Sequence, residues 1–424
     1  MVNEKQNRLN RRNFLKTVTA AGLGAAFTSA KAIPAPGQSD ASEKVPEHKL
    51  PQVPKRRLGK LTRLSKSGER VPLEVPALSF GTFRVDTQSQ ILLRKALQYG
   101  INFWDTAYDY SQGNSELGIG KFISKHPDVR KELFIASKAS DTETIADVEH
   151  RLRTSLERMN TNYIDLYYFH ELEQTDRLNN DLRDWAKHAK ERNLIRFFGF
   201  TVHRNMTEYL ELAVKLDWID AIMLRYNFRD MQDKELSNAI DACHKRGIAL
   251  IAMKVQGKGQ VKKIETEGDK KLTDHFIKRG FTAAQAKIKA VLTDKRICSA
   301  CVGMQNVALL TSNVAVALDK TTLTSHDMNV FRKVAQETCS GYCAGCAHIC
   351  DSALPDMPCV SDVMRYLMYY NSYSDKEVAR KLFAEIPEHF RDKLAGTDYS
   401  AAQARCPQHL EIGKLVAEAV GKLA

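Results

Sequence analysis

Four ionisable side chains lie where three short, β-prone segments of the chain end. Asp105 ends the first of these segments, and Tyr110 lies five residues beyond it. Lys138 ends the second segment, and His170 ends the third. Because the carboxyl ends of neighbouring parallel strands meet at the same edge of a sheet, we expect these four side chains to share one site.

This set of side chains suits the reduction of a carbonyl group. A tyrosine hydroxyl can protonate a developing alkoxide, but its ordinary pKa of about 10 requires tuning. A lysine ammonium stabilises the phenolate, an aspartate holds the lysine, and a histidine donor orients the carbonyl oxygen. Each residue alone could equally cap a helix, fill a core or carry a solvated charge. Their joint placement at consecutive strand ends favours catalysis.

The elements that position these residues alternate regularly along the chain. Eight units of a short β-prone run and a longer helical period lie between residues 79 and 318, which predicts an α/β fold, a (β/α)8 TIM barrel. A doubly wound sheet is the alternative, but no glycine-rich phosphate fingerprint follows the first strand. The strands are expected at Leu78–Gly81, Asn102–Thr106, Leu133–Ser137, Ile164–His170, Phe197–Thr201, Ala221–Leu224, Ile248–Met253 and Cys298–Val302.

The chain divides into four parts. Residues 1–32 have the layout of a signal peptide, residues 33–55 read as a linker, and residues 56–318 form the barrel with an N-terminal β-hairpin. Residues 319–424 are expected to be a small, mostly helical, cysteine-rich domain.

The segment from Gly100 to Tyr110, GINFWDTAYDY, resembles the signature of the aldo/keto reductase family. Residues 132–138, 163–170 and 195–203 resemble further blocks of that family in the right order, so the resemblance covers roughly 56–318. It implies that Tyr110 is the general acid and that Asp105, Lys138 and His170 complete a catalytic tetrad. It also implies a nicotinamide cofactor, NADP(H) or NAD(H), that exchanges hydride with a small carbonyl or alcohol substrate.

The same resemblance implies a set of cofactor-binding residues, with some departures from the family pattern. Val202, Met223, Met253 and Leu309 stand where the family often has residues that hold the nicotinamide or the 2′-phosphate. The choice between NAD and NADP therefore stays open. The residues expected at the cofactor are Gly81, Thr82, Thr201, Gly303, Met304, Gln305 and Asn313.

The N-terminus resembles a twin-arginine (Tat) export signal. Arg11-Arg12 precedes a short apolar stretch, and Ala30-Lys31-Ala32 provides small residues at a cleavage site. We expect passage through the Tat translocase to a periplasmic or otherwise exported location; a basic amphipathic N-terminus is the alternative. Removing residues 1–32 lowers the formal charge from +12 to +7. The remaining charge is scattered and argues against nucleic-acid binding.

Six of the nine cysteines follow residue 338. The run C-x3-C-x2-C-x3-C resembles the ferredoxin-like extension of one aldo/keto reductase branch and implies a 4Fe-4S cluster. The first spacing is one residue longer than in ferredoxins, and Cys406 or Cys359 could replace one ligand. Three alternatives stay open: a zinc site that uses the same thiolates with His348 as a candidate ligand, disulfides, and free thiols. The preferred metal ligands are Cys339, Cys343, Cys346 and Cys350.

The sequence thus predicts an exported, NAD(P)-dependent aldo/keto reductase with a C-terminal iron–sulfur centre and a redox partner. No apolar run reaches the roughly 18 residues that span a bilayer. Two other classes remain open: an electron-transfer or redox-binding protein that keeps the barrel without nicotinamide turnover, and a zinc-stapled binding protein. Cys243, Cys298 and Cys301 fall in barrel elements and are expected to be core residues.

Overall fold

The computed structural model describes residues 50–65, 67–140, 142–172, 174–257, 267–337, 343, 347–373, 376–406 and 410–424. Eight parallel strands close into a barrel, in which β10 pairs with β3 and each other strand pairs with its sequence neighbours. The predicted TIM barrel is confirmed. The strands are β3 (Leu78–Gly81), β4 (Phe103–Asp105), β5 (Phe134–Ala139), β6 (Ile164–Phe169), β7 (Ile195–Val202), β8 (Ala221–Arg225), β9 (Ala249–Met253) and β10 (Ser299–Gly303).

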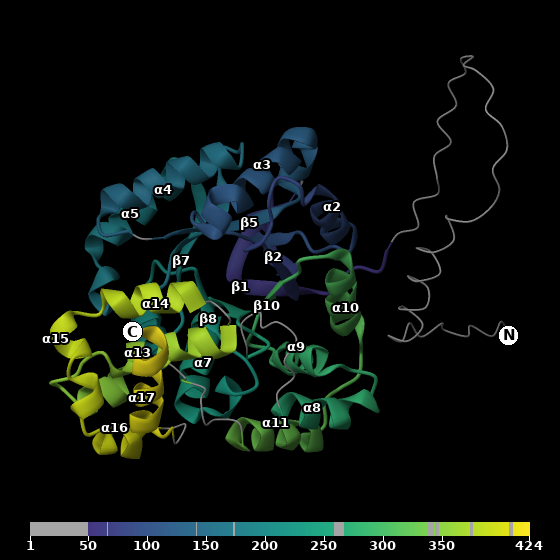
Figure 1. Ribbon diagram of the computed structural model, residues 1–424. Coiled ribbons are helices and arrows are strands. Elements are labelled where there is room, and N and C mark those ends of the chain that lie inside the picture. The colour runs from purple at the N-terminus through teal and green to yellow at the C-terminus, as the bar shows by residue number, and fades with distance from the viewer. Residues whose placement is uncertain are drawn as a thin grey trace, which may run out of the picture.

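Helices surround the barrel, as Figure 1 shows. One helix follows each strand, and α8 (Glu267–Ile277) is an additional helix between β9 and α9 that the sequence patterns did not indicate. The regular helices are α2 (Gln90–Gln98), α3 (Asn114–Lys125), α4 (Ile145–Arg158), α5 (Asn180–Glu191), α6 (Met206–Lys215), α7 (Lys234–Arg246), α9 (Ala283–Thr293) and α10 (Val307–Leu318).

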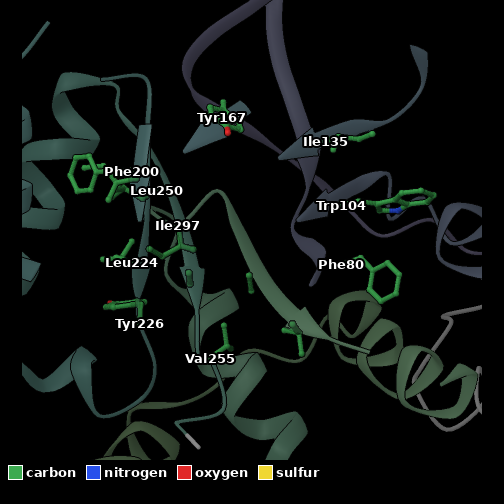
Figure 2. Packing of buried hydrophobic residues seen from close by; sticks show 14 of the residues in the cluster. Phe80, Trp104, Ile135, Tyr167, Phe200, Leu224, Tyr226, Leu250, Val255 and Ile297 are labelled. Carbon is green, nitrogen blue, oxygen red and sulfur yellow. The ribbon is translucent and has the colours of Figure 1, made fainter. Parts of the chain in front are cut away.

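The main core lies between the strands and this ring of helices. Successive strands each contribute large apolar side chains to it, because alternate residues of a barrel strand face outward. Figure 2 shows Phe80, Trp104, Ile135, Tyr167 and Phe200, one from each strand from β3 to β7. Each of these side chains is fully buried. The alternate, inward-facing positions are left to fill the barrel interior and to build the site.

A two-stranded antiparallel hairpin, β1 (Lys55–Leu64) and β2 (Arg70–Pro76), closes the amino-terminal end of the barrel. Its apolar side chains, among them Leu58 and Val75, pack against Phe103 and Phe134 from the barrel interior. Gly59 has a positive φ of 57°, and a Cβ there would lie 2.4 Å from the carbonyl oxygen of Gly247. A glycine at this position therefore lets the hairpin approach the turn before β9.

The chain after α10 forms two packed groups of helices. α11 (Ser325–Glu337) shares a core with α8 and α9. A separate core joins the remaining helices, which appear in yellow-green to yellow in Figure 1. None of the helices in the described part of the chain is long and apolar enough to cross a membrane. The helices of this second core are α12 (Ala347–Cys350), α13 (Val360–Met368), α14 (Lys376–Glu385), α15 (Glu388–Arg391), α16 (Ser400–Arg405) and α17 (Ile412–Leu423).

Candidate active site

Lys138 joins three of the four predicted catalytic residues at the carboxyl ends of β4 and β5. Its ammonium nitrogen Nζ donates to Asp105 Oδ2 at 2.8 Å, to the carbonyl oxygen of Thr106 at 2.6 Å and to the Tyr110 hydroxyl at 3.2 Å. Lys138 is 1% exposed and Asp105 is 3% exposed. The three hydrogen bonds use all three ammonium protons, so the geometry of this buried cation is fixed.

Burial and the neighbouring charges together determine the protonation states of Lys138 and Tyr110. Burial alone would lower the pKa of Lys138, but the adjacent Asp105 carboxylate and the Tyr110 hydroxyl outweigh burial and raise it. Burial raises the pKa of Tyr110, and the Lys138 ammonium offsets part of this increase. At neutral pH the lysine is therefore charged and the tyrosine is protonated. A buried hydroxyl beside a cation is suited to give up its proton to an oxygen that is gaining negative charge.

Tyr110 lies in a short, irregular turn between β4 and α3. The next two residues, Ser111 and Gln112, have positive φ values of 51° and 56°. The Ser111 hydroxyl donates to the backbone carbonyl of Phe83 at 2.6 Å, which ties this turn to the loop after β3. The ring of Phe83 also meets the Tyr110 ring edge to face, with 5.0 Å between centroids. These contacts hold the phenol against Lys138.

His170 follows β6, and its ring centroid lies 6.0 Å from that of Tyr110. Its Nδ1 atom lies 2.5 Å from Ser140 Oγ, which in turn donates to Asp109 Oδ1 at 2.7 Å. A carboxylate only accepts, so the single hydroxyl proton of Ser140 is directed at Asp109. Ser140 must then accept the proton of His170 Nδ1. Burial lowers the pKa of His170, so the neutral ring with its proton on Nδ1 prevails at neutral pH.

Asp109 and Ser140 were not singled out from the sequence. Asp109 lies inside the recognised segment GINFWDTAYDY, and Ser140 lies two residues after Lys138. Their proximity to His170 depends on the alignment of β5 with β6, in which Lys138 pairs with Tyr168 and Ala139 pairs with Phe169. No spacing along the chain indicates it.

The rim beside His170 includes side chains from the C-terminal helices. Glu171 Oε1 lies 3.1 Å from His203 Nε2, so these two side chains connect the loops that follow β6 and β7. Arg365 on α13 donates to the Tyr369 hydroxyl at 2.6 Å, and its charge acts on Glu171. Arg204, in the loop after β7, forms an ion pair with Asp362, which is also on α13. The helices of residues 360–369 therefore border the carboxyl end of the barrel.

The residues predicted to bind the cofactor fall into two groups. Thr82 and Thr201 are fully buried next to the site; Thr82 donates to the Asp105 carbonyl at 2.8 Å, and Thr201 Oγ1 accepts the Glu171 N–H at 2.8 Å. A Cβ on Gly81 would lie 3.3 Å from the sulfur of Cys301, so the chain passes close to β10 here.

The second group lies at β10 and α10. Just before the start of α10, Gly303 and Gln305 are exposed and Met304 is buried. Asn306 caps this helix by accepting the Leu309 N–H at 2.8 Å. Asn313 is 1% exposed, and its Nδ2 atom has no hydrogen-bond partner among the residues that the structure describes. A buried amide donor without a partner is costly, so an acceptor from a bound group would complete it. The exposed amino end of α10 provides a favourable place for phosphate nearby. This region fits an adenosine phosphate.

Two of the four replaced positions lie at the barrel interior, Val202 lies in the main core and Leu309 lies on α10. Met223 on β8 is 1% exposed and packs in the cluster that fills the barrel, and Met253 at the end of β9 is partly buried in the same cluster. Val202 at the end of β7 is fully buried. These three apolar side chains have no polar atom that could form a hydrogen bond with a carboxamide.

The described cysteines fall into two groups, one in the barrel and one in the C-terminal helices, as their positions along the chain indicate. Cys243 and Cys298 are buried in core clusters, and Cys301 is partly buried on β10. Cys343, Cys359 and Cys406 are buried in the C-terminal core, and Cys350 packs against it. No disulfide joins two of the described cysteines. Among these residues no group of three or more His, Cys, Asp or Glu side chains is placed to hold a metal ion; Cys339 and Cys346 lie outside the described part.

Comparison with known proteins identifies the barrel. The sequence profile described as the aldo/keto reductase family matches residues 77–336. An aldo-keto reductase of Gibberella moniliformis is 28% identical over 205 residues, which are 44% of this chain and 61% of that protein. L-Galactose dehydrogenase of Arabidopsis thaliana is 23% identical over 274 residues, which are 58% of this chain and 86% of that protein.

Solved structures show the same fold. An aldo-keto reductase from Bacillus halodurans in its holo form superposes with a TM-score of 0.54 and 21% identity, covering 67% of this chain and 96% of that one. A thermostable aldo-keto reductase in complex with the inhibitor epalrestat gives a TM-score of 0.52 at 23% identity, covering 65% of this chain and 99% of that one. Both matches leave about a third of the chain uncovered, so they carry no information on that remainder.

Proposed function

Because the chain belongs to the aldo/keto reductase family of oxidoreductases, we propose that it transfers hydride between NADP(H) or NAD(H) and the carbonyl carbon of a small substrate. The observation that carries this proposal is the buried Lys138, which is hydrogen-bonded to Asp105 and to Tyr110. A nicotinamide dinucleotide, when bound, supplies the hydride. The exposed start of α10 and the unpartnered amide of Asn313 support a place for its adenosine phosphate.

Tyr110 acts as the general acid of the reduction. As the carbonyl carbon receives hydride, negative charge develops on the oxygen, and the Tyr110 hydroxyl transfers its proton to that oxygen. The resulting phenolate is stabilised by the Lys138 ammonium at 3.2 Å, and Asp105 at 2.8 Å keeps this ammonium charged and in place. Proton uptake from water then restores the phenol. The same residues perform the reverse steps when an alcohol is oxidised.

His170 adds a pH-dependent contribution to this reaction. In the neutral ring with its proton on Nδ1, Nε2 is a hydrogen-bond acceptor and does not attract a carbonyl oxygen. Protonation makes Nε2 a donor that can orient the carbonyl and stabilise its developing charge. We therefore assign His170 to substrate orientation and expect carbonyl reduction to be favoured by acid.

Titration of the protein with NADPH and NADH, followed by nicotinamide fluorescence, tests this function. Tyr110→Phe should bind the cofactor as the wild type does, since the ring and its packing against Phe83 remain, and should lose turnover of small aldehydes and ketones. If the wild type binds neither NADPH nor NADH, the reductase proposal fails. The alternative of a barrel without nicotinamide turnover is then preferred, because Met223 and Met253 occupy positions that often hold the nicotinamide.

We further propose that the C-terminal cysteines bind a 4Fe-4S cluster. Support comes from the chemistry of the donor set: buried Cys343, Cys359 and Cys406, with Cys350 beside them, bring thiols from distant parts of the sequence to one small core. Thiolates are the ligands of iron–sulfur clusters. Burial raises the pKa of Cys359 to about 11, so this thiol is protonated unless a metal is bound.

Anaerobic purification, followed by an absorbance spectrum and by analysis of iron, sulfide and zinc, tests the cluster. Equal amounts of iron and sulfide, together with visible absorbance from the cluster, are expected. A colourless protein with stoichiometric zinc would indicate a structural zinc site instead, and a metal-free protein would exclude both. Cys298→Ser, a buried barrel cysteine outside this group, is the matched control for cysteine substitution.

Export through the Tat translocase to the periplasm remains a proposal that rests on residues 11–32. Expression of the full chain and of an Arg11→Lys, Arg12→Lys variant, followed by cell fractionation, tests it. The variant should remain in the cytoplasmic fraction. Equal distribution of the two proteins would argue against twin-arginine export.

A further inference from the structure

A second charged cavity lies at the opposite end of the barrel from Tyr110. It measures about 980 Å³, and its walls are formed by β1, by the turn before β9 and by the segments that follow α9 and α10. These segments all lie at the amino-terminal ends of the strands, whereas the tetrad follows their carboxyl ends. We call this space the basal cavity. Its volume is that of a site for a ligand of nucleotide size.

The lining of the basal cavity is strongly basic. Eight lysine and arginine residues and His244 contribute to it, and Asp319 is the one carboxylate among the lining residues. Three of the cations hold the fold together. Arg56 donates to carbonyl oxygens beyond α9, including that of Ile297 at 2.8 Å, and Arg296 binds Asp294 at 2.7 Å. Lys289 pairs with Asp319 at 3.4 Å.

The other five cations of the lining have no such partner. Within the described part of the chain, their side chains make neither a hydrogen bond nor an ion pair. They come from three separate segments that the fold brings to one cavity, so their gathering is a tertiary feature and no run of charge in the sequence indicates it. These residues are Lys55, Arg57, Lys60, Lys295 and Lys320.

The cations also crowd one another. Lys289 is 8% exposed, and burial lowers its pKa by more than the Asp319 carboxylate raises it; the neighbouring charges of Lys295 and Arg56 add a smaller lowering. A bound anion would remove this repulsion, because an opposite charge favours the charged form of each lysine. Leu292 and the partly buried Ala317 add a small apolar surface to the same wall. A ligand that matches this lining carries several negative charges and an organic part.

We propose that the basal cavity binds a small organic polyphosphate, a molecule with at least two phosphate groups and an organic moiety of nucleotide size. Phosphate groups would interact with Lys60, Lys295 and Lys320 at the mouth of the cavity, and the organic moiety would lie against Leu292 and Ala317. The site is separate from the tetrad and does not depend on nicotinamide binding. Its occupant would brace the hairpin β1–β2 against the segment before β10.

Isothermal titration calorimetry with two probes, inorganic tripolyphosphate and ATP, at physiological salt tests this site. The test protein carries Lys60→Gln, Lys295→Gln and Lys320→Gln. A matched control carries Lys121→Gln, Lys215→Gln and Lys278→Gln, three exposed lysines outside the cavity that also lack ion pairs. Both proteins lose the same net charge, so they differ only in where it is lost.

We expect one equivalent of tripolyphosphate to bind the wild type, and ATP to bind more tightly because of its organic part. The cavity variant should weaken both affinities at least 10-fold, and the control should stay within 2-fold of the wild type. Absence of saturable binding, or equal weakening in both variants, overturns the proposal. Sedimentation with phosphatidylglycerol vesicles, compared with phosphatidylcholine vesicles, tests whether the cavity binds lipid headgroups instead. Binding to phosphatidylglycerol vesicles without binding of tripolyphosphate overturns the proposal in favour of a lipid surface.

Discussion

Replacing Asp109 by alanine should change which ring nitrogen of His170 carries the proton. In the wild type, Ser140 Oγ donates to Asp109 Oδ1 at 2.7 Å, so it accepts from His170 Nδ1 at 2.5 Å. Without the carboxylate, the Ser140 hydroxyl is able to turn its proton to Nδ1. The neutral ring then carries its proton on Nε2 and becomes a donor at neutral pH.

The size of this preference follows from the hydrogen bond that is removed. A hydrogen bond to a charged group contributes about 1.5–3 kcal/mol, compared with roughly 1 kcal/mol for a neutral pair. Asp109 therefore favours the Nδ1–H form by about 0.5–2 kcal/mol, or roughly 2- to 30-fold. Asp109 is 46% exposed, which places the value toward the lower end of that range because water screens the charge.

Nitrogen-15 NMR of the histidine rings at pH 8 measures the tautomer directly. We expect His170 to be protonated on Nδ1 in the wild type and on Nε2 in Asp109→Ala. Ser140→Ala removes the hydroxyl that links His170 Nδ1 to Asp109 and should give a mixture, and Asp109→Asn should retain the wild-type form because its carbonyl oxygen still accepts. A wild-type spectrum with the proton on Nε2 would refute this reasoning.

Four further predictions follow from the structure. Tyr110→Phe should lower kcat for carbonyl reduction by about 10²- to 10⁴-fold with unchanged cofactor affinity, as measured by steady-state kinetics and fluorescence titration; a smaller loss would assign the proton to another group. Since burial lowers the pKa of His170 below its ordinary value, wild-type reduction should slow as pH rises through that lowered pKa, whereas Asp109→Ala, whose neutral ring can still donate from Nε2, should show a flatter profile over the same pH range; matching profiles would contradict the relay. Gly59→Ala should lower the free energy of unfolding by about 2–4 kcal/mol, because the new Cβ would lie 2.4 Å from the Gly247 carbonyl oxygen. The control Gly68→Ala has a positive φ of 84° but nothing within 4 Å of its Cβ, so it should cost about 1 kcal/mol. Thermal unfolding measures both, and equal losses would argue against the close approach. Asp362→Asn should break the ion pair with Arg204 and increase hydrogen exchange in α13 at unchanged melting temperature of the barrel; unaltered exchange would mean that the ion pair does not hold these helices to the barrel.

The sequence by itself determined the barrel and where its reactive residues lie. Alternation of short apolar strands with amphipathic helices is a local property, so eight units could be counted, and β3 has the bounds that the patterns predict. Asp105, Lys138 and His170 end or follow strands, and parallel strands place such ends together whatever the side-chain details. Helix α8 escaped prediction because it lies in a lysine-rich stretch without a clear apolar period.

Only the tertiary structure decided which side chains touch. The Asp109–Ser140–His170 relay requires residues 31 and 30 positions apart to meet, and strand register sets that meeting. The proximity of α13 to the loops after β6 and β7 likewise depends on how the C-terminal helices pack, for which the sequence offers no periodic signal. The basal cavity gathers cations from β1 and from segments more than 200 residues later, because barrel closure brings β10 back beside β3. Hydrophobic periodicity is encoded residue by residue, whereas charge complementarity across a closed barrel exists only once the chain has folded.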